Sequence, residues 1–476
     1  MRQIQRLTKT LFLPLGTVFC LSGCTTLAPK YSQPAAPVPA AWQSSQAAPA
    51  ATAGPAQKAV ATIPWQEFFV DAKLNKLIEL ALKNNRDLRV AALNMERYRA
   101  LYQIKSADQL PKLEASAGAS FQRVPETLSG TGSAMNTHQY TIGAGLLSYE
   151  LDLFGRVQSL KDQALEQYFA TEQAQRSVQL TLVSQVAATW LAYAADRERL
   201  QLAKDTLANQ QESYTLIKSR FDAGVSNSLT LNQALTTLES AKVDIARYST
   251  LVAQDENALS FVVGSSVPSD LLPQTLSESL TSLKNIAPGL HSDVLLNRPD
   301  ILQAESQLKG FNANIGAARA AFFPKITLVS SVGFGSTELS GLFKGGAFAW
   351  SFAPRISLPI FDGGSNKANL KVAEVDRDIA VAQYEKAIQT AFREVADALA
   401  QSGTIDEQLA AQQSLTDATS ESYKLSQARF DKGVDSFLTV LDSQRSLYGA
   451  RQGLISTRQA SLASLVTLYK ALGGGQ

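Results

Sequence analysis

The stretch from Glu421 to Arg445 reads ESYKLSQARFDKGVDSFLTVLDSQR, and a stretch that begins 209 positions earlier, at Glu212, reads ESYTLIKSRFDAGVSNSLTL. Both contain the triplet Arg-Phe-Asp, a Gly-Val pair whose glycine is two residues past the aspartate, and then Leu-Thr. Glycine adopts the left-handed conformation that ends a helix and lets the chain reverse. Each stretch therefore predicts the tip of a helical hairpin, and the chain is predicted to be a tandem repeat.

Long helices are expected on both sides of each tip. No glycine or proline occurs from Arg156 to Phe221, which predicts a helix of roughly 100 Å at about 1.5 Å per residue. After each tip, hydrophobic residues recur at every seventh position, a spacing typical of a coiled coil. The two series are Leu231, Leu238, Ile245, Val252 and Leu259, and then Val434, Leu441, Tyr448, Ile455, Leu462 and Tyr469.

The N-terminus has the pattern of a lipoprotein signal peptide over residues 1–23. Three basic residues precede an apolar run that ends at Leu21, and Leu21-Ser22-Gly23-Cys24 resembles a lipobox. We expect cleavage before Cys24, a diacylglycerol (lipid) group on its thiol and an N-acyl chain such as palmitate. The alternative is an ordinary signal peptide with an unmodified cysteine. Cys20 and Cys24 are the only cysteines, so the mature chain can form no internal disulfide.

The rest of the chain divides into a tether and two repeats. Residues 24–64 contain seven prolines, which predicts an extended, lipidated Pro/Ala-rich tether. The first repeat, 65–270, is predicted to hold strands over 113–124 and 138–153 and a helical hairpin over 156–263. The second repeat, 271–476, is predicted to hold a belt segment over 271–299, a helix over 300–321, strands over 325–337 and 348–361, and a hairpin over 365–471.

The four predicted strands alternate apolar and polar residues with a period of two, which is typical of membrane β-strands. A soluble hairpin is the alternative. A sheet in hydrocarbon must close into a barrel of at least eight strands, so one chain with four strands must share its barrel with copies of itself. Two copies give a filled barrel, whereas three give twelve strands and an open lumen. The polar positions expected to line it are Ser116, Ser120, Gln122, Thr141, Thr327 and Ser331.

Four stretches carry a resemblance to the outer-membrane factor (TolC-like) family, and most closely to its OprM/NodT-type efflux lipoproteins. They are Tyr149–Arg156, Asn297–Pro324, Leu358–Gly364 and Arg429–Arg445. The resemblance implies an α+β membrane protein, a homotrimer that shares one 12-stranded β-barrel on a long periplasmic α-helical coiled-coil barrel. It also implies a lipid-anchored, barrel-inserted protein of the cell outer membrane with most of the chain in the periplasm.

The resemblance further implies a periplasmic gate at the second tip. Leu438 and Asp442 match an apolar and an acidic ring that close the channel, and Arg445 matches the basic partner of neighbouring helices. Three Asp442 carboxylates near one axis would repel one another and admit cations. In the first repeat the counterpart of Asp442 is Gln233, so only one acidic ring is expected. The alternative is that these are ordinary coiled-coil residues.

The hairpin tips themselves, Gly224-Val225 and Gly433-Val434, resemble the places where the family's adaptor docks. The function implied is the exit channel of a tripartite pump–adaptor–channel efflux system that exports drugs and other small toxic compounds. Its partners would be a periplasmic adaptor (membrane fusion protein), an inner-membrane RND-type pump and outer-membrane lipid. Alternatives are an exit duct for type I protein secretion or metal-ion efflux, or a structural periplasmic coiled-coil lipoprotein.

No pattern in the sequence indicates an active site. The only histidines are His138, in a predicted surface loop, and His291, in the predicted belt segment, and neither belongs to a ligand-spaced cluster. Gly333-Phe334-Gly335 lies in a predicted strand without the following helix that a nucleotide-binding loop needs. A formal net charge of +2, which includes three basic residues of the signal peptide, excludes a nucleic-acid-binding surface. We therefore predict no enzymatic activity, metal or cofactor apart from the lipid on Cys24.

Overall fold

The computed structural model describes residues 26–42, 63–130, 132–276 and 291–474. The signal peptide, Cys24, residues 43–62 of the predicted tether and part of the predicted belt segment therefore lie outside the described residues. The chain forms two compact units, and both repeats contribute to each of them. Unit 1 comprises Met1–Pro34, Met95–Thr171 and Ala304–Tyr384, and unit 2 comprises Ala35–Asn94, Glu172–Gln303 and Glu385–Gln476.

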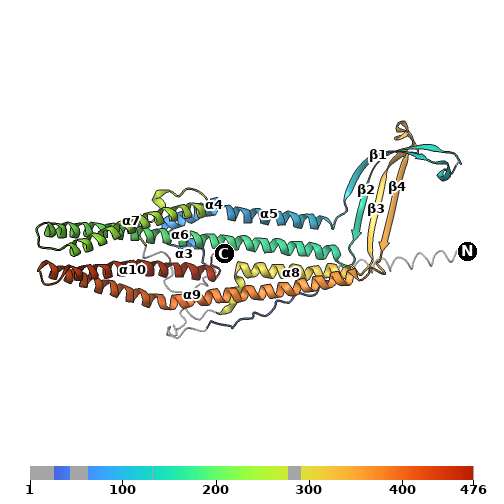
Figure 1. Cartoon of the computed structure of the whole chain (residues 1–476). Coiled ribbons are helices and arrows are strands. Elements are labelled where there is room, and N and C mark those ends of the chain that lie inside the picture. The colour runs from blue at the N-terminus through green and yellow to red at the C-terminus, as the bar shows by residue number, and fades with distance from the viewer. Residues whose placement is uncertain (1–25, 43–62, 131, 277–290, 475–476) are drawn as a thin grey trace. The chain divides into compact units, whose positions relative to one another are not determined.

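Each repeat is built from the same series of elements: helix, two strands and a helical hairpin (Figure 1). The first contains α3 (Trp65–Phe68), α4 (Ala72–Asn84), α5 (Arg86–Ala107), β1 (Leu113–Val124), β2 (Met135–Leu151), α6 (Arg156–Asp222) and α7 (Ser228–Val263). The second contains α8 (Pro299–Ala320), β3 (Lys325–Ser336), β4 (Phe348–Ser357), α9 (Ser365–Asp431) and α10 (Phe437–Ala471).

Two strands differ from the sequence prediction by three or more residues at one end. β2 starts at Met135, three residues before the predicted start at 138, because the pairing with β1 continues until Met135 lies opposite Val124. β4 ends at Ser357, four residues before the predicted end at 361. Ser357 lies opposite Lys325, the first residue of β3, so the partner strand ends there, and Pro359 has no N–H with which to extend the ladder.

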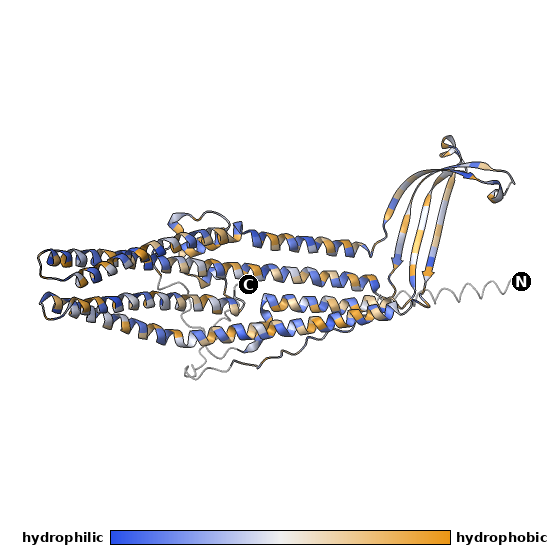
Figure 2. Ribbon diagram, in the orientation of Figure 1, coloured by the Kyte–Doolittle hydropathy of each residue, from blue (hydrophilic) through white to orange (hydrophobic). Residues whose placement is uncertain are grey.

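In unit 1 the four strands form one antiparallel sheet in the order β1-β2-β3-β4 (Figure 1). The register places Ala117 opposite Ile142, Ile142 opposite Phe334 and Phe334 opposite Phe348, so these four residues share one face. The same register puts all six of the polar positions predicted to line a lumen on the other face. Hydrophilic and hydrophobic residues accordingly follow one another along the strands (Figure 2).

The junction of the two repeats in this sheet is the β2–β3 pair, and its polar face is rich in glycine. Gly143 lies directly opposite Gly333. A Cβ atom on Gly143 would lie 2.7 Å from the carbonyl oxygen of Val332, and one on Gly333 would collide with the carbonyl oxygen of Ile142. Glycine is needed here because the two backbones approach too closely for any side chain.

In unit 2 the two helical hairpins pack together at their tips through a shared hydrophobic cluster. It consists of Ile217, Ala234, Phe430, Phe437, Val440 and Leu441. Several of the residues spaced seven apart are buried, among them Leu238, Leu441 and Tyr469. The one stretch among the described residues that is apolar and long enough to cross a membrane lies in α6 and is 56% buried.

Candidate functional site

Both tips close with the same hydrogen-bonding motif. At the first tip, Gly224 has φ 75° and donates to the carbonyl of Phe221 at 2.9 Å, while Val225 donates to the carbonyl of Arg220 at 2.9 Å. This is a Schellman motif, which requires a left-handed residue at the position of Gly224. The hairpin that the sequence predicts at this tip is therefore formed as expected.

The second tip repeats this geometry and adds an ion pair. Gly433 has φ 73°, and Val434 donates to the carbonyl of Arg429 at 2.9 Å. The Arg429 side chain also makes two hydrogen bonds to Asp435, at 2.6 and 2.9 Å, which brace the turn. Val434 is exposed, like Val225 at the first tip, so each tip presents one apolar side chain.

The three residues that the resemblance assigns to a gate lie on one exposed face of α10. Leu438, Asp442 and Arg445 are spaced four and three residues apart, which places them on one side of a helix. Val440, on the opposite side of the helix, and Phe437 and Leu441 on its flank are buried in the tip cluster. Asp442 and Arg445 lie 3.9 Å apart with both side chains exposed, so this pair contributes little stability by itself.

Below the tips, polar side chains join α7 of the first hairpin to α10 of the second. Tyr448 donates a 2.9 Å hydrogen bond to Asp244, and Gln452 donates one of 2.9 Å to the hydroxyl of Tyr248. Burial, followed by the hydrogen bond to Asp244, raises the pKa of Tyr448 above its ordinary value. The phenol therefore stays protonated and donating, and the two contacts tie the helix that carries Leu438 to its neighbour.

A pair of carboxyl groups connects α6 and α7 in the same unit. Burial, and next the charge of Asp196, raise the pKa of Asp255 to about 6. Oδ2 of Asp255 is buried without a hydrogen-bond partner, whereas Asp196 forms an ion pair with Arg199 at 2.5 Å. Arg199 in turn donates to Ser456 of α10 at 3.0 Å. Three helices therefore meet at this group, and its charge changes in the mildly acidic range.

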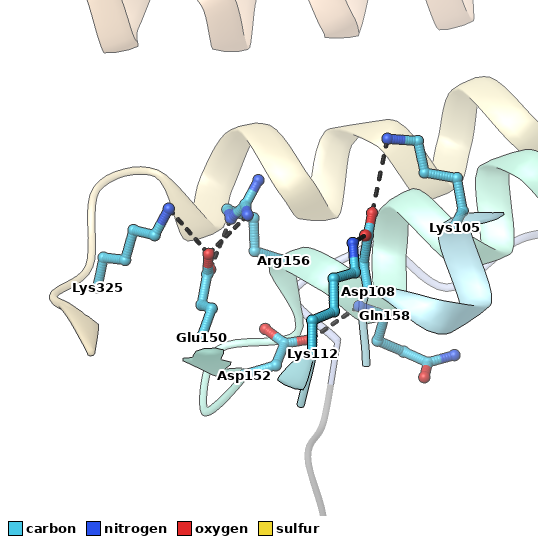
Figure 3. A network of polar contacts seen from close by, with 8 residues as sticks. All are labelled: Lys105, Asp108, Lys112, Glu150, Asp152, Arg156, Gln158 and Lys325. Atoms are coloured by element: carbon cyan, nitrogen blue, oxygen red, sulfur yellow. Dashed lines mark hydrogen bonds and ion pairs between the residues drawn. The ribbon is translucent and has the colours of Figure 1, made fainter. Parts of the chain in front are cut away.

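At the base of the sheet in unit 1, Glu150 connects three elements (Figure 3). It accepts two hydrogen bonds of 2.7 Å from Arg156 at the start of α6, and its carboxylate lies 2.9 Å from Nζ of Lys325 at the start of β3. Asp152 caps α6 by accepting from the N–H of Gln158 at 2.7 Å. These contacts give the Tyr149–Arg156 stretch a structural role, because its acidic and basic residues hold the chain in place where strand β2 ends and helix α6 begins.

The described beginning of the predicted tether is extended, as expected, but it is bound to the helices of unit 1. Thr26 hydrogen-bonds to Ser159 at 2.7 Å, and Tyr31 donates to Glu305 at 3.0 Å. Gln33 donates to the hydroxyl of Tyr384 at 3.0 Å. Composition predicted the extended conformation but gave no signal for these contacts, because each depends on one isolated polar side chain of the tether.

The part of the Asn297–Pro324 stretch that belongs to unit 2 contains a buried cation whose role the sequence did not reveal. Arg298 is 7% exposed and donates to Asp300 at 2.7 Å, to Glu394 of α9 at 2.8 Å and to the carbonyl of Ala471 at 2.6 Å. It therefore ties the start of α8 to α9 and to the end of α10. The motif around Arg298 is structural.

The two histidines do not form a site. His138 lies within β2, the strand predicted over 138–153, and not in a surface loop, and its ring packs edge-on against Phe121 with the ring centroids 5.3 Å apart. His291 lies 2.9 Å from Asp293. Within the described ranges, no group of three or more His, Cys, Asp or Glu side chains could hold a metal ion.

Comparison with known proteins gives consistent matches over almost the whole chain. The family described as "Outer membrane efflux protein" matches residues 77–265 and 290–474. The solvent efflux pump outer membrane protein SrpC of Pseudomonas putida is 48% identical over 97% of this chain and 98% of its own. A membrane protein of Pseudomonas aeruginosa has a TM-score of 0.88 at 43% identity, and covers 95% of this chain and 98% of its own. The open state of the Neisseria gonorrhoeae MtrE outer membrane channel has a TM-score of 0.85 at 38% identity, and it also covers 95% of this chain and 98% of its own.

Proposed function

Because the chain belongs to the outer membrane efflux protein family, we propose that this outer-membrane exit channel exports small toxic organic compounds and stays closed at its hairpin tips until a periplasmic adaptor binds. The family and its relatives confirm the predicted resemblance and the outer-membrane location. The family consists of channels, which confirms that the chain is not an enzyme, and it uses no cofactor. The predicted fold class is confirmed too, since the matched channels are trimers and this chain supplies four strands and two repeats.

The observation that carries the proposal is the division of the sheet into an apolar and a polar face, made by four strands whose edges are open. Three copies supply twelve strands, which close a barrel wide enough for a lumen. The apolar face then meets lipid, and the polar face, with Ser116, Thr141 and Ser331, lines the lumen. Small, uncharged polar side chains let solutes of varied chemistry pass without strong binding.

Closure at the tips is supported by the exposed face of α10. In a trimer, three copies of Leu438 and three of Asp442 surround one axis, which gives an apolar constriction next to an acidic ring. The apolar ring excludes water when narrow, and the acidic ring favours cations. The adaptor would bind near Val225 and Val434 and displace α10 from its closed position.

The remaining partners are inferred from the pump systems in which the family works. SrpC is named for solvents, TtgI for toluene and ArpC for antibiotics, all three from Pseudomonas putida. These names favour small organic compounds over proteins or metal ions as the exported substrates here. An RND-type pump in the inner membrane would select the substrate and deliver it through the adaptor.

Lipidation of Cys24 is part of the proposal. Thr26, two residues later, is hydrogen-bonded to Ser159 next to the base of the sheet in unit 1. Acyl chains on Cys24 would therefore enter the membrane beside the barrel. Metabolic labelling with palmitate, compared between the natural chain and Cys24→Ala, tests this, and equal labelling would contradict it.

A strain that lacks this channel tests the exported class. We expect greater sensitivity to organic solvents and to unrelated antibiotics, with recovery when the natural chain is expressed again. As the matched control, the same strain expresses Gly333→Ala, which we expect to form no barrel and therefore to restore no resistance. Unchanged sensitivity to both kinds of compound, together with lost tolerance of a metal ion or lost protein secretion, would overturn the proposed substrate class.

A further inference from the structure

The outer strands of the sheet end in open edges. Within the described residues, β1 pairs only with β2, and β4 only with β3. The β2–β3 pairing, where the two repeats meet inside each chain, is called the seam here. We infer that this seam is repeated between copies, so that β4 of one copy pairs with β1 of the next, with Phe352 opposite Phe121. This inference rests on the three-copy channel proposed above and specifies how its copies meet. An open edge in hydrocarbon would leave backbone groups unpaired at a cost of several kcal/mol each.

The two repeats define which strands correspond. Pro111 and Pro324 precede β1 and β3 and are 213 positions apart. Leu113 on β1 lies opposite Leu146, and its counterpart on β3, Ile326, lies opposite Ile356. Leu146 therefore corresponds to Ile356, which makes β4 the counterpart of β2 at a distance of 210 positions.

The register between copies follows from the seam inside the chain. There, Ile142 of β2 lies opposite Phe334 of β3, and Gly145 lies opposite Ser331. Replacing each β2 residue by its β4 counterpart, and each β3 residue by its β1 counterpart, converts these two pairs into new ones. The new pairs are Phe352 opposite Phe121, and Arg355 opposite Gly118.

Both new pairs agree with the faces of the sheet. Phe352 and Phe121 belong to the apolar face, and Arg355 and Gly118 to the polar face. A shift of one residue would turn every apolar side chain of β4 toward the polar face of its neighbour, so only shifts of two can compete.

Gly118 and Arg355 give independent support. Nothing in its own chain requires glycine at 118, since an added Cβ would meet only Oγ1 of Thr141 at 3.6 Å. Arg355 is exposed, and its guanidinium makes no hydrogen bond or ion pair with any other residue that the structure describes. In the inferred register, the long side chain of Arg355 faces the one position on β1 that has no side chain. Shifts of two would put Ser116 or Ser120 there instead.

Paired cysteines in the full-length, membrane-inserted protein test the register. Phe352→Cys with Phe121→Cys is one pair, and Arg355→Cys with Gly118→Cys is the other. The two pairs are three rows apart, so one is a hydrogen-bonded pair and the other is not, and both Cα separations suit a disulfide. After oxidation we expect covalent trimers on boiled, non-reducing gels, because three disulfides close the ring, and reductant should return them to monomers.

Matched variants separate the outcomes. Ile142→Cys with Phe334→Cys is the equivalent pair inside one chain and should crosslink within monomers. Phe352→Cys combined with Ala119→Cys or Arg123→Cys tests registers shifted by two residues. Stronger crosslinking of a shifted pair would overturn the register. Unboiled trimers without any crosslink between copies, while the internal pair forms, would overturn the seam, whereas a natural chain without trimers would overturn the proposed channel itself.

Discussion

The hydroxyl of Tyr448 on α10 donates a 2.9 Å hydrogen bond to Oδ2 of Asp244 on α7, and this contact joins the second helices of the two hairpins. Asp244 also lies 3.1 Å from Arg247, and hydrogen bonds to a carboxylate are among the stronger ones in proteins. Leu438 and Asp442 lie on the same helix as Tyr448. Any displacement of α10 away from α7 must therefore break this hydrogen bond, which makes it a restraint on the proposed gate.

Tyr448→Phe should loosen the closed channel. It removes only the hydroxyl, and a hydrogen bond to a charged group contributes about 1.5–3 kcal/mol. We expect more frequent openings of the purified channel in planar bilayers, with no change in the fully open conductance. Tyr423→Phe is the control, because Tyr423 packs against the tip cluster and its hydroxyl makes no hydrogen bond to another described residue. Equal opening of both variants would contradict the restraint.

Leu438→Ala combined with Asp442→Ala should widen the gate itself. The change removes the apolar constriction and the acidic ring together, so we expect higher single-channel conductance and greater antibiotic influx while trimers remain intact. Leu229→Ala with Gln233→Ala is the matched control, since these residues occupy the equivalent places after the first tip. Unchanged conductance of the Leu438/Asp442 variant would remove the gate assignment and leave the fold untouched.

Local patterns in the sequence were enough to predict the repeat and its helices and strands. Gly224 and Gly433 predicted both tips, because a left-handed residue after a helix has few alternatives, and the period of two predicted the strands. The ends of β2 and β4 were less accurate, since pairing with a neighbour and Pro359 decide them. Contacts between helices could not be predicted. Asp244 and Tyr448 are 204 positions apart, and only the packing of α7 against α10 brings them together.

Gly333→Ala should prevent formation of the sheet. The added methyl group would collide with the carbonyl oxygen of Ile142, a backbone atom that cannot move without breaking the β2–β3 pairing. We expect loss of trimers in the outer-membrane fraction on unboiled gels. Gly335→Ala is the control on the same strand and face, where the nearest atoms would be 3.9 Å away. Normal trimer yield from Gly333→Ala would show that the seam between the repeats tolerates side chains.

Arg298→Met should destabilise unit 2 although it touches neither gate nor sheet. Breaking a buried ion pair by removing one partner costs about 3–5 kcal/mol, and the lower end applies because Asp300 and Glu394 are partly exposed. Arg298→Lys should recover little, since one ammonium cannot reproduce the planar guanidinium contacts. Thermal unfolding of the detergent-solubilised trimer measures the effect. Arg377→Met, which removes a more exposed pair with Asp378, should cost at most about 1 kcal/mol, and equal losses would contradict the role of Arg298.

Asp255→Asn should stabilise the protein at neutral pH and flatten its pH dependence. Burial and Asp196 raise the pKa of Asp255 from 3.8 to about 6, so between these values the folded protein holds a proton that the unfolded chain has released. The free energy of unfolding therefore falls as pH rises through this window, and the cost persists at pH 7. Asparagine carries no charge, so we expect a gain of about 1 kcal/mol at pH 7.5, after allowance for partial exposure, and about a third of that at pH 4.5, where the unfolded chain has already released most of its proton. Thermal midpoints across this range measure it, with Asp406→Asn on the exposed surface of α9 as control. A gain that is the same at both pH values would show that Asp255 is charged throughout.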